Sequence, residues 1–248
     1  MNVFITGATA GFGLSIARRF AQDGHRVILT GRRQDRLDAA VAEIGAHAHA
    51  VVLDVRDRDA VLAAVAGLPA DFAAIDVLVN NAGLALGIAP AQKADLDEWH
   101  TMVDTNVKGL MTVTHAILPG MVERARGHVI NIGSVAGNWP YPGGNVYGAT
   151  KAFVQQFSLN LRADLAGTHV RVTNIEPGMV AGTEFSDVRF GGDAGKAANV
   201  YKGTEPLMPD DVTDAVHWVA TRPAHVNINT LELMPVCQAF GGFTIQRS

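Results

Sequence analysis

Residues 6–13 of the chain read Thr6-Gly7-Ala8-Thr9-Ala10-Gly11-Phe12-Gly13, a glycine-rich loop between an apolar run at 3–6 and an amphipathic segment at 12–23. The glycines permit a tight turn and a close approach of the backbone to a ligand. A helix N-terminus also favours bound anions. Because the loop follows a predicted strand and opens a predicted helix, it predicts a site for the pyrophosphate of a dinucleotide. An ordinary structural turn is the alternative, since glycine also marks turns.

Around this loop, short apolar runs alternate with longer amphipathic segments. The runs are nearly continuous in hydrophobicity, as is typical of strands buried on both faces. This alternation predicts right-handed β-α-β crossovers and a Rossmann-type α/β fold, with a doubly wound parallel sheet of about seven strands, helices on both faces and a single domain over residues 1–248. The expected strands are 3–6, 27–30, 50–53, 75–79, 128–132, 170–175 and 230–233, and the longest expected helices are 12–23, 34–44, 95–121 and 147–166.

Composition narrows the function classes. The 248 residues carry a net charge of −4 and show no basic face, which argues against nucleic-acid binding. No apolar stretch approaches the ~20 residues of a membrane span. No charged n-region and apolar h-region stand ahead of the first strand, so we expect no secretory leader. The single cysteine, Cys237, excludes an intrachain disulfide. The nine histidines show no metal-ligand spacing, so no metal is expected. We therefore expect a cytoplasmic protein with a small-molecule substrate.

The spacing of the loop is G-x-x-x-G-x-G, and further motifs follow it in a fixed order. They are Asn80-Asn81-Ala82-Gly83 after the fourth run, Asn106 in the next long segment, Ser134 after the fifth run, Tyr147-Gly148-Ala149-Thr150-Lys151 at a helix start, and Pro177-Gly178 after the sixth run. In these motifs the whole chain resembles the short-chain dehydrogenase/reductase family. That resemblance implies hydride transfer with a nicotinamide cofactor.

Two stretches narrow the resemblance. Residues 138–145 and 223–229 are similar to those of bacterial NADP-dependent 3-hydroxy acid dehydrogenases, also called serine or allo-threonine dehydrogenases. This implies oxidation or reduction at the 3-carbon of small acids such as serine, allo-threonine and 3-hydroxypropionate or malonic semialdehyde. Two alternatives stay open: a reductase of another carbonyl, such as a ketoacyl thioester or a sugar, and a non-catalytic NADPH sensor.

The candidate catalytic residues are Tyr147, Lys151, Ser134 and Asn106. Tyr147 and Lys151 are four residues apart, so they share a helix face, and a nearby ammonium favours the phenolate. Ser134 is expected to hydrogen-bond the substrate oxygen opposite Tyr147. The resemblance implies that Asn106 distorts its helix and holds a water in a proton relay with Lys151.

Arg32 and Arg33 follow the second strand where an NAD enzyme commonly has an acid. Guanidinium groups suit a 2′-phosphate, so the pair predicts NADP; a solvated basic pair is the alternative. The family commonly has a Thr five residues after the Pro of the Pro-Gly turn, whereas here Gly182 occupies that place and Thr183 follows. The resemblance implies a cofactor site built from Gly7, Thr9, Gly11, Phe12, Gly13, Arg32, Arg33, Asp54, Val55, Asn81, Ala82, Gly83, Tyr147, Lys151, Pro177, Gly178, Val180 and Thr183.

The irregular segment 177–209 is expected to cover the substrate, either as a lid loop or with short helices in it. Within it, Arg189 is flanked by apolar residues and followed by two glycines, which suits a closing loop that brings a guanidinium to a substrate carboxylate. An ordinary surface arginine is the alternative. The resemblance implies a homotetramer, and the apolar tail 234–248 is expected to dock on a neighbouring subunit or to fold back on its own.

Overall fold

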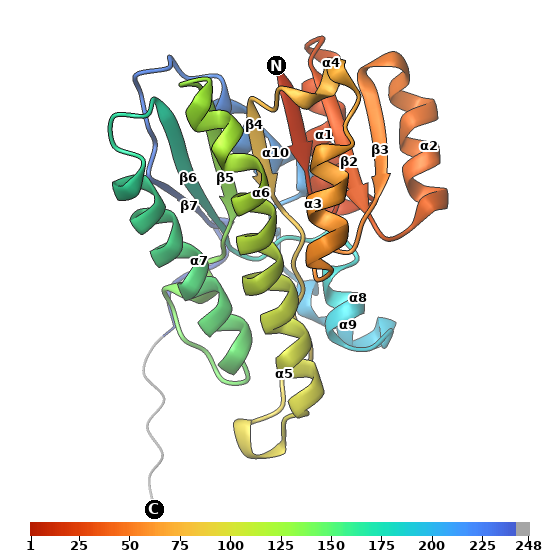
Figure 1. Cartoon of the computed structure of the whole chain (residues 1–248). Helices are drawn as coiled ribbons and strands as arrows, with labels where there is room; N and C mark the ends of the chain where they lie inside the picture. The colour runs from red at the N-terminus through yellow and green to blue at the C-terminus, as the bar shows by residue number, and fades with distance from the viewer. Residues whose placement is uncertain (242–248) are drawn as a thin grey trace, which may run out of the picture.

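A parallel sheet forms the centre of the molecule in the computed structural model, which describes residues 1–241 (Figure 1). The strand order is β3-β2-β1-β4-β5-β6-β7, and every pairing is parallel. This confirms the predicted Rossmann-type α/β fold. The strands are β1 Asn2–Ile5, β2 Arg26–Gly31, β3 Ala48–Val52, β4 Val77–Asn80, β5 Gly127–Ile132, β6 Val170–Pro177 and β7 Thr230–Leu233.

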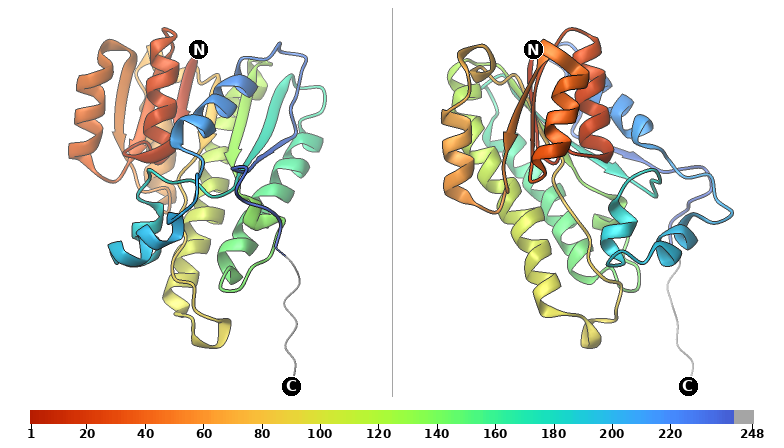
Figure 2. Two further views of the ribbon diagram at one scale, coloured as in Figure 1. Left: turned by 180° about the vertical axis from the view of Figure 1, so that it is seen from behind. Right: turned by 90° about the vertical axis from the view of Figure 1, so that its right-hand side faces the viewer.

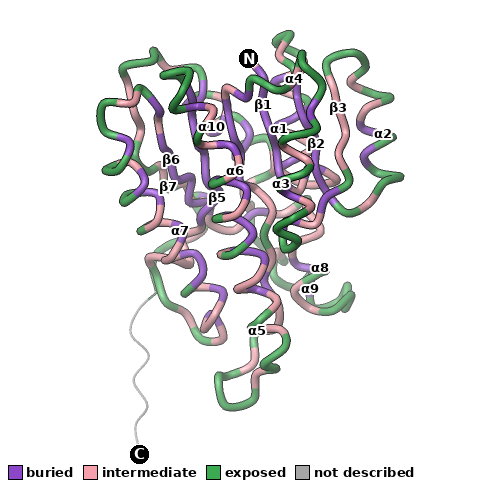
Figure 3. The backbone as a smooth tube through the Cα atoms, in the orientation of Figure 1, coloured by how far each residue is buried: buried purple, intermediate pink, exposed green. Residues whose placement is uncertain are grey.

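Helices cover both faces of the sheet (Figure 2). One face packs against α1, α2 and α10, and the other against α3, α6 and α7. The central strands are therefore buried along their whole lengths (Figure 3), which explains their continuous hydrophobicity. The helices are α1 Gly11–Gln22, α2 Gln34–Ile44, α3 Arg58–Ala66, α4 Ala70–Ala73, α5 Leu96–Val103, α6 Leu110–Glu123, α7 Asn145–Asp164, α8 Phe185–Arg189, α9 Ala194–Tyr201 and α10 Pro209–Ala220.

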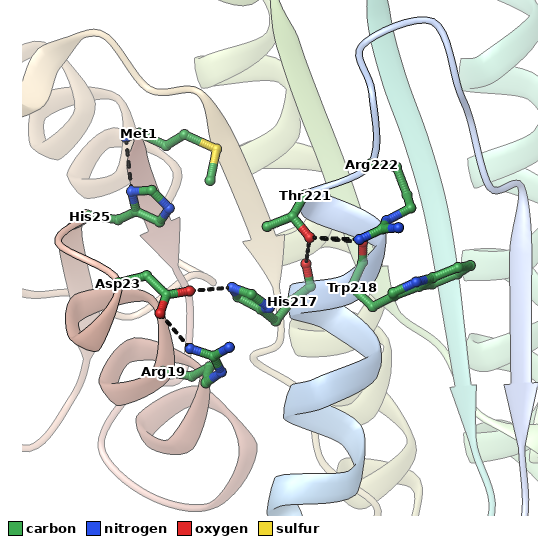
Figure 4. A network of polar contacts seen from close by, with 8 residues as sticks. All are labelled: Met1, Arg19, Asp23, His25, His217, Trp218, Thr221 and Arg222. Carbon is green, nitrogen blue, oxygen red and sulfur yellow. Dashed lines mark hydrogen bonds and ion pairs between the residues drawn. The ribbon is translucent and has the colours of Figure 1, made fainter.

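Polar contacts join α1 to α10 at the end away from the glycine loop (Figure 4). Asp23, just after α1, accepts a hydrogen bond from Arg19 and contacts Nε2 of His217 on α10, each at 2.7 Å. The ring of Phe20 packs against the rings of His25 and His217, with centroids 6.0 and 5.2 Å away. These contacts fix α10 on the sheet face that α1 occupies.

Two segments differ from a simple reading of the sequence. The helix expected over 95–121 is interrupted by a π-helical turn, Asp104–Gly109, between α5 and α6. The segment 177–209 contains the short helices α8 and α9 and a β-bridge between Val180 and Leu207, so the alternative of short helices is correct. Both helices lie beyond the carboxyl ends of the strands (Figure 1).

The direction in which successive strands are added to the sheet reverses between β1 and β4. From β1 the chain winds outward to β2 and β3, then returns to β4 on the other side of β1 and continues outward to β7. In open α/β sheets, ligands bind outside the carboxyl ends of the strands at this switch point. The glycine loop, the Asn80–Gly83 motif and Ser134 all follow strands at this edge.

Candidate active site

The glycine loop has the backbone that a dinucleotide phosphate requires. Gly7 and Gly11 have φ values of +68° and +52°, which side chains other than glycine adopt at a cost. A Cβ on Gly13 would lie 2.4 Å from the carbonyl oxygen of Gly7. The side-chain amide of Asn81 donates to the carbonyls of Thr6 and Gly7 at 2.9 and 3.1 Å, and so holds the loop against β4. The loop therefore exposes its backbone and the start of α1 to a ligand.

A cavity of about 860 Å³ runs from this loop across the carboxyl edge of the sheet. That volume is at the upper end for small-molecule sites. One end is lined by Arg32 and Asp54, and the other by Tyr147 and Arg189. All of the residues expected to hold the cofactor line it except Gly13, which lies beneath Gly7. The residues present fit an NADP molecule lying across the switch point.

Tyr147 points into the inner part of this cavity from the first turn of α7. Only 8% of the residue is exposed, and its ring packs on Phe185 with centroids 5.7 Å apart. Burial raises the pKa of Tyr147 to about 12, although the Ser134 hydroxyl and the Arg189 guanidinium both act to lower it. The phenol is therefore protonated at neutral pH and can give a proton to a substrate oxygen.

Lys151 lies one turn further along α7, equally buried. Its Nζ donates to the carbonyl of Ile132 at 2.7 Å and lies 5.9 Å from the centroid of the Tyr147 ring. Burial lowers the pKa of Lys151 to about 8. The helix spacing is as predicted. However, burial rather than the nearby ammonium dominates the pKa of Tyr147 in this structure.

Asn106 lies in the π-helical turn, as a distorted helix around it would require. Its Oδ1 accepts from the amide of Leu84 at 2.9 Å, and its Nδ2 donates to the Leu84 carbonyl at 2.8 Å and to Oγ1 of Thr150 at 3.1 Å. A Cβ on Gly83 would lie 3.3 Å from Oδ1 of Asn106 and 3.6 Å from Nζ of Lys151. Asn106 and Lys151 therefore border the same small space.

Ser134 faces the cavity from the turn after β5. Its hydroxyl donates to the carbonyl of Pro177 at 3.4 Å and accepts from the amide of Ala136 at 3.1 Å. A larger residue than Gly133 before it would displace the Asn174 side chain, because a Cβ there would lie 2.5 Å from Oδ1 of Asn174. The predicted approach of Ser134 to Tyr147 is consistent with the influence of its hydroxyl on the tyrosine pKa.

The two arginines after β2 have different surroundings. Arg32 lines the cavity, and within residues 1–241 its guanidinium has no hydrogen-bond partner. Arg33 instead makes a bidentate ion pair with Glu184, with Nη1–Oε1 and Nη2–Oε2 distances of 3.0 and 2.7 Å. Its Nη2 also donates to Oγ1 of Thr9 at 2.9 Å. The two arginines are therefore not equivalent, because the donors of Arg33 already bond Glu184 and Thr9.

Arg189 lies at the end of α8, next to the ring of Tyr147. Its Cζ is 5.9 Å from the centroid of the Tyr147 ring, and its Nη2 donates to the hydroxyl of Tyr141 at 2.9 Å. Its Nε donates to the carbonyl of Gly87 at 3.3 Å. The guanidinium thus lines the cavity beside Tyr147, and it does not point away from the site.

The chain matches the family model for short chain dehydrogenases over residues 1–191. It is 64% identical to the NADP-dependent 3-hydroxy acid dehydrogenase YdfG of Salmonella typhi, with all of both chains covered.

The chain belongs to the short-chain dehydrogenase family.

It is also 56% identical to the serine 3-dehydrogenase of Rhizobium radiobacter, over 99% of this chain and 98% of that one. Among solved structures, the closed form of serine dehydrogenase complexed with NADP+ matches all of both chains with a TM-score of 0.99 and 63% identity.

Sequence reasoning missed the part that the C-terminal segment plays in this short-chain dehydrogenase. Met234, Gln238 and Phe240 line the cavity of their own subunit. Oε1 of Gln238 accepts from the amide of Met179 at 2.7 Å, and the Phe240 ring lies 4.3 Å from that of Trp139. The tail therefore folds back on its own subunit as far as Gly241; the remaining residues of the expected docking segment, 242–248, lie outside the described part. An apolar tail gives no signal that distinguishes these alternatives.

A buried acid supports the turn after Ser134. Glu176 is 1% exposed, and it accepts hydrogen bonds from Asn174 at 2.7 Å and from Asn138 at 2.8 Å. Burial raises the pKa of Glu176. Nδ2 of Asn138 and Nε1 of Trp139 both donate to Glu232, at 3.1 and 3.0 Å. The acid between Ile175 and Pro177, at the end of a predicted buried strand, was the signal that could have revealed this support.

Neither a metal site nor a membrane-spanning helix is found in the described residues. Between Met1 and Gly241 no group of three or more His, Cys, Asp or Glu side chains could hold a metal ion. No helix within those residues has the length and apolarity needed to cross a membrane.

Proposed function

We propose that this short-chain dehydrogenase moves a hydride between NADP(H) and the 3-carbon of small 3-hydroxy acids or their 3-oxo forms. The observation that carries the proposal is the grouping of a proton donor, a hydroxyl and a cation at one end of the dinucleotide cavity. Tyr147, Ser134 and Arg189 line that end together. The relatives reported above are an NADP-dependent 3-hydroxy acid dehydrogenase and a serine 3-dehydrogenase, which supports the same substrate class.

The proton chemistry belongs to Tyr147. When bound, the nicotinamide supplies or accepts the hydride. For carbonyl reduction, Oη of Tyr147 gives its proton to the substrate oxygen while Ser134 donates a hydrogen bond to the same oxygen; for oxidation both roles reverse. The protonated phenol, with a pKa of about 12, is ready for the reductive direction. Lys151 returns a proton to Tyr147 and regains one from a water that Asn106 would hold.

The cofactor would be held by residues along the rest of the cavity. Backbone amides of the glycine loop would bind the pyrophosphate, and Arg32 would bind the 2′-phosphate. Asp54 and Val55 would border the adenine. Thr183 lies against the glycine loop, 3.3 Å from a Cβ placed on Gly11, and the backbone around Val180 would bind the carboxamide. Arg189 binds the carboxylate of the substrate.

A panel assay tests this function. Absorbance of NADPH is followed with malonic semialdehyde, a ketoacyl thioester and a sugar aldehyde, and with serine, allo-threonine and 3-hydroxypropionate in the oxidative direction. We expect the highest kcat/KM for the small acids and their oxo forms, with NADP(H) far better than NAD(H). A higher value for a thioester or sugar would reassign the substrate class. Tight NADPH binding without turnover on any substrate would indicate a sensor.

We also propose a homotetramer in the cytoplasm. The lone cysteine, Cys237, is free and would persist in a reducing compartment, and the family resemblance favours four subunits. Light scattering coupled to gel filtration gives the mass of the assembly, which we expect near four times 26.2 kDa. A monomer mass would contradict the tetramer, and recovery of the protein outside the cytoplasmic fraction of its host would contradict the location.

A further inference from the structure

The short helix α8 is held at both ends by an arginine. At its start, Glu184 pairs with Arg33, which follows β2. At its end, Arg189 donates to the carbonyl of Gly87 and the hydroxyl of Tyr141. The five residues of α8 therefore connect the adenosine end of the cavity to the end where Tyr147 lies.

Arg33 bonds a residue of the phosphate loop as well as Glu184. Nη2 of Arg33 bonds both Oε2 of Glu184 and Oγ1 of Thr9, at 2.7 and 2.9 Å. Thr9 belongs to the phosphate loop, and its methyl group occupies the space that a Cβ on Gly31 would need, at 2.5 Å. The position of Thr9 is therefore fixed by packing on β2. One guanidinium thus bonds to both the phosphate loop and the segment that covers the substrate.

Arg32 is differently placed. It lines the same cavity, and no acidic partner holds its guanidinium within residues 1–241. It can meet a 2′-phosphate without breaking an existing ion pair. Arg33 would have to share its donors, because the end of its fork is already occupied by a carboxylate.

We propose that Glu184 is a positioning residue that acts through Arg33 to latch the α8 segment to the phosphate loop. The latch keeps both substrate cover and cofactor in place, whereas recognition of the 2′-phosphate falls mainly to Arg32. Because the pair lies on the protein's own elements, it works without the 2′-phosphate and retains NADPH and NADH alike. The backbone supports a closed segment, since it matches the closed NADP+ complex of serine dehydrogenase with a TM-score of 0.99.

The latch is tested first on the protein alone. Hydrogen exchange of residues 185–201 is measured for Glu184→Gln, Arg33→Ala and the double variant. Exposed ion pairs contribute modestly, so we expect exchange about two- to fivefold faster in each single variant. The double variant should be no faster than the singles, because both remove the same contact. The matched control is Asp187→Asn, which removes an acid inside α8 that forms no ion pair within residues 1–241; it should exchange like the wild type.

The second measurement is cofactor release, followed by nicotinamide fluorescence in stopped flow. Glu184→Gln should speed the release of NADPH and NADH by the same factor, about two- to fivefold, and 1 M NaCl should reduce that factor. Unchanged hydrogen exchange in Glu184→Gln would overturn the latch. An effect confined to NADPH would overturn it too, and would make Glu184 a modulator of phosphate recognition.

This inference rests on the proposed cofactor site, and the two can fail separately. Hydrogen exchange of the free protein reports on the latch even if no nicotinamide binds. Conversely, normal NADPH binding with unchanged exchange would leave the proposed function in place and remove the latch.

Discussion

Lys151 lies one helical turn after Tyr147, with its Nζ 5.9 Å from the centroid of the tyrosine ring and 2.7 Å from the carbonyl oxygen of Ile132. Burial moves the two pKa values in opposite directions, raising that of Tyr147 to about 12 and lowering that of Lys151 to about 8. Both shifts oppose the charged form, as desolvation does. The pair is therefore set up as a protonated phenol above an ammonium that can lose its proton close to neutral pH.

Replacing Tyr147 by Phe should abolish most turnover. The phenyl ring keeps the packing on Phe185, but the transferable proton is gone, and general acid–base groups contribute about 10²–10⁴-fold. We expect kcat to fall by that range while the dissociation constant for NADPH stays within twofold. Single-turnover kinetics and a fluorescence titration measure the two quantities. Near-normal turnover would remove Tyr147 from the proton-donor role.

Replacing Arg32 by Ala should weaken NADPH binding far more than NADH binding. A hydrogen bond to a charged group contributes about 1.5–3 kcal/mol, so we expect the NADPH dissociation constant to rise about 10- to 100-fold. NADH lacks the phosphate, and its constant should change little. Equal losses for the two cofactors would mean that Arg32 serves the fold only. Arg36→Ala, at a neighbouring position in α2, is the control.

The fold could be predicted almost completely from the sequence, because parallel strands buried on both faces and a glycine loop at a strand end leave few arrangements. The expected bounds of the seventh strand, 230–233, agree with β7. The sequence predicted one continuous helix over 95–121, because the apolar periodicity does not reveal the extra residue per turn of a π-helix. The π-helical turn Asp104–Gly109 inserts there and carries Asn106.

The candidate site could be predicted only as far as local motifs reach. Ser134, Tyr147 and Lys151 follow from motifs, and all three line the cavity. The partner of Arg33 did not follow, because Glu184 is 151 residues away in the sequence and no local pattern joins them. The part of the cavity formed by the C-terminal segment could not be predicted for the same reason. Gln238 contacts Met179 only after the sheet has brought β6 and β7 together.

Replacing Arg189 by Met should separate substrates by charge. If Arg189 binds the carboxylate, kcat/KM for a 3-oxo acid should fall about 10-fold or more, equivalent to about 1.4 kcal/mol, and that for its methyl ester much less. The substitution also removes the contacts with Tyr141 and Gly87. That loss should change kcat/KM for both substrates.

Tyr141→Phe is therefore the matched control for this experiment. It removes the hydroxyl that accepts from Arg189 at 2.9 Å but keeps the guanidinium charge. We expect Tyr141→Phe to change kcat/KM for the acid and for the ester by the same factor. An equal loss on acid and ester in Arg189→Met as well would assign the arginine a structural role alone.

Replacing Lys151 by Met should change how stability depends on pH. The pKa of Lys151 in the folded protein, about 8, lies below the ordinary lysine pKa of 10.5. Between these values the unfolded chain binds more protons than the folded protein, so the lysine's contribution to stability rises with pH. Below pH 8 both states are protonated, and burial of the ammonium costs about 3 kcal/mol at 1.36 kcal/mol per pKa unit. That cost disappears by pH 11.

Loss of the bond to Ile132 lowers the stability of the variant by the same amount at every pH, and the rise in the pKa of Tyr147 is common to both proteins. Denaturant unfolding from pH 7 to 11 should therefore show wild-type stability rising by about 3 kcal/mol relative to Lys151→Met. A difference between the two proteins that does not vary with pH would show that Lys151 titrates normally, and that burial does not prepare it to release a proton.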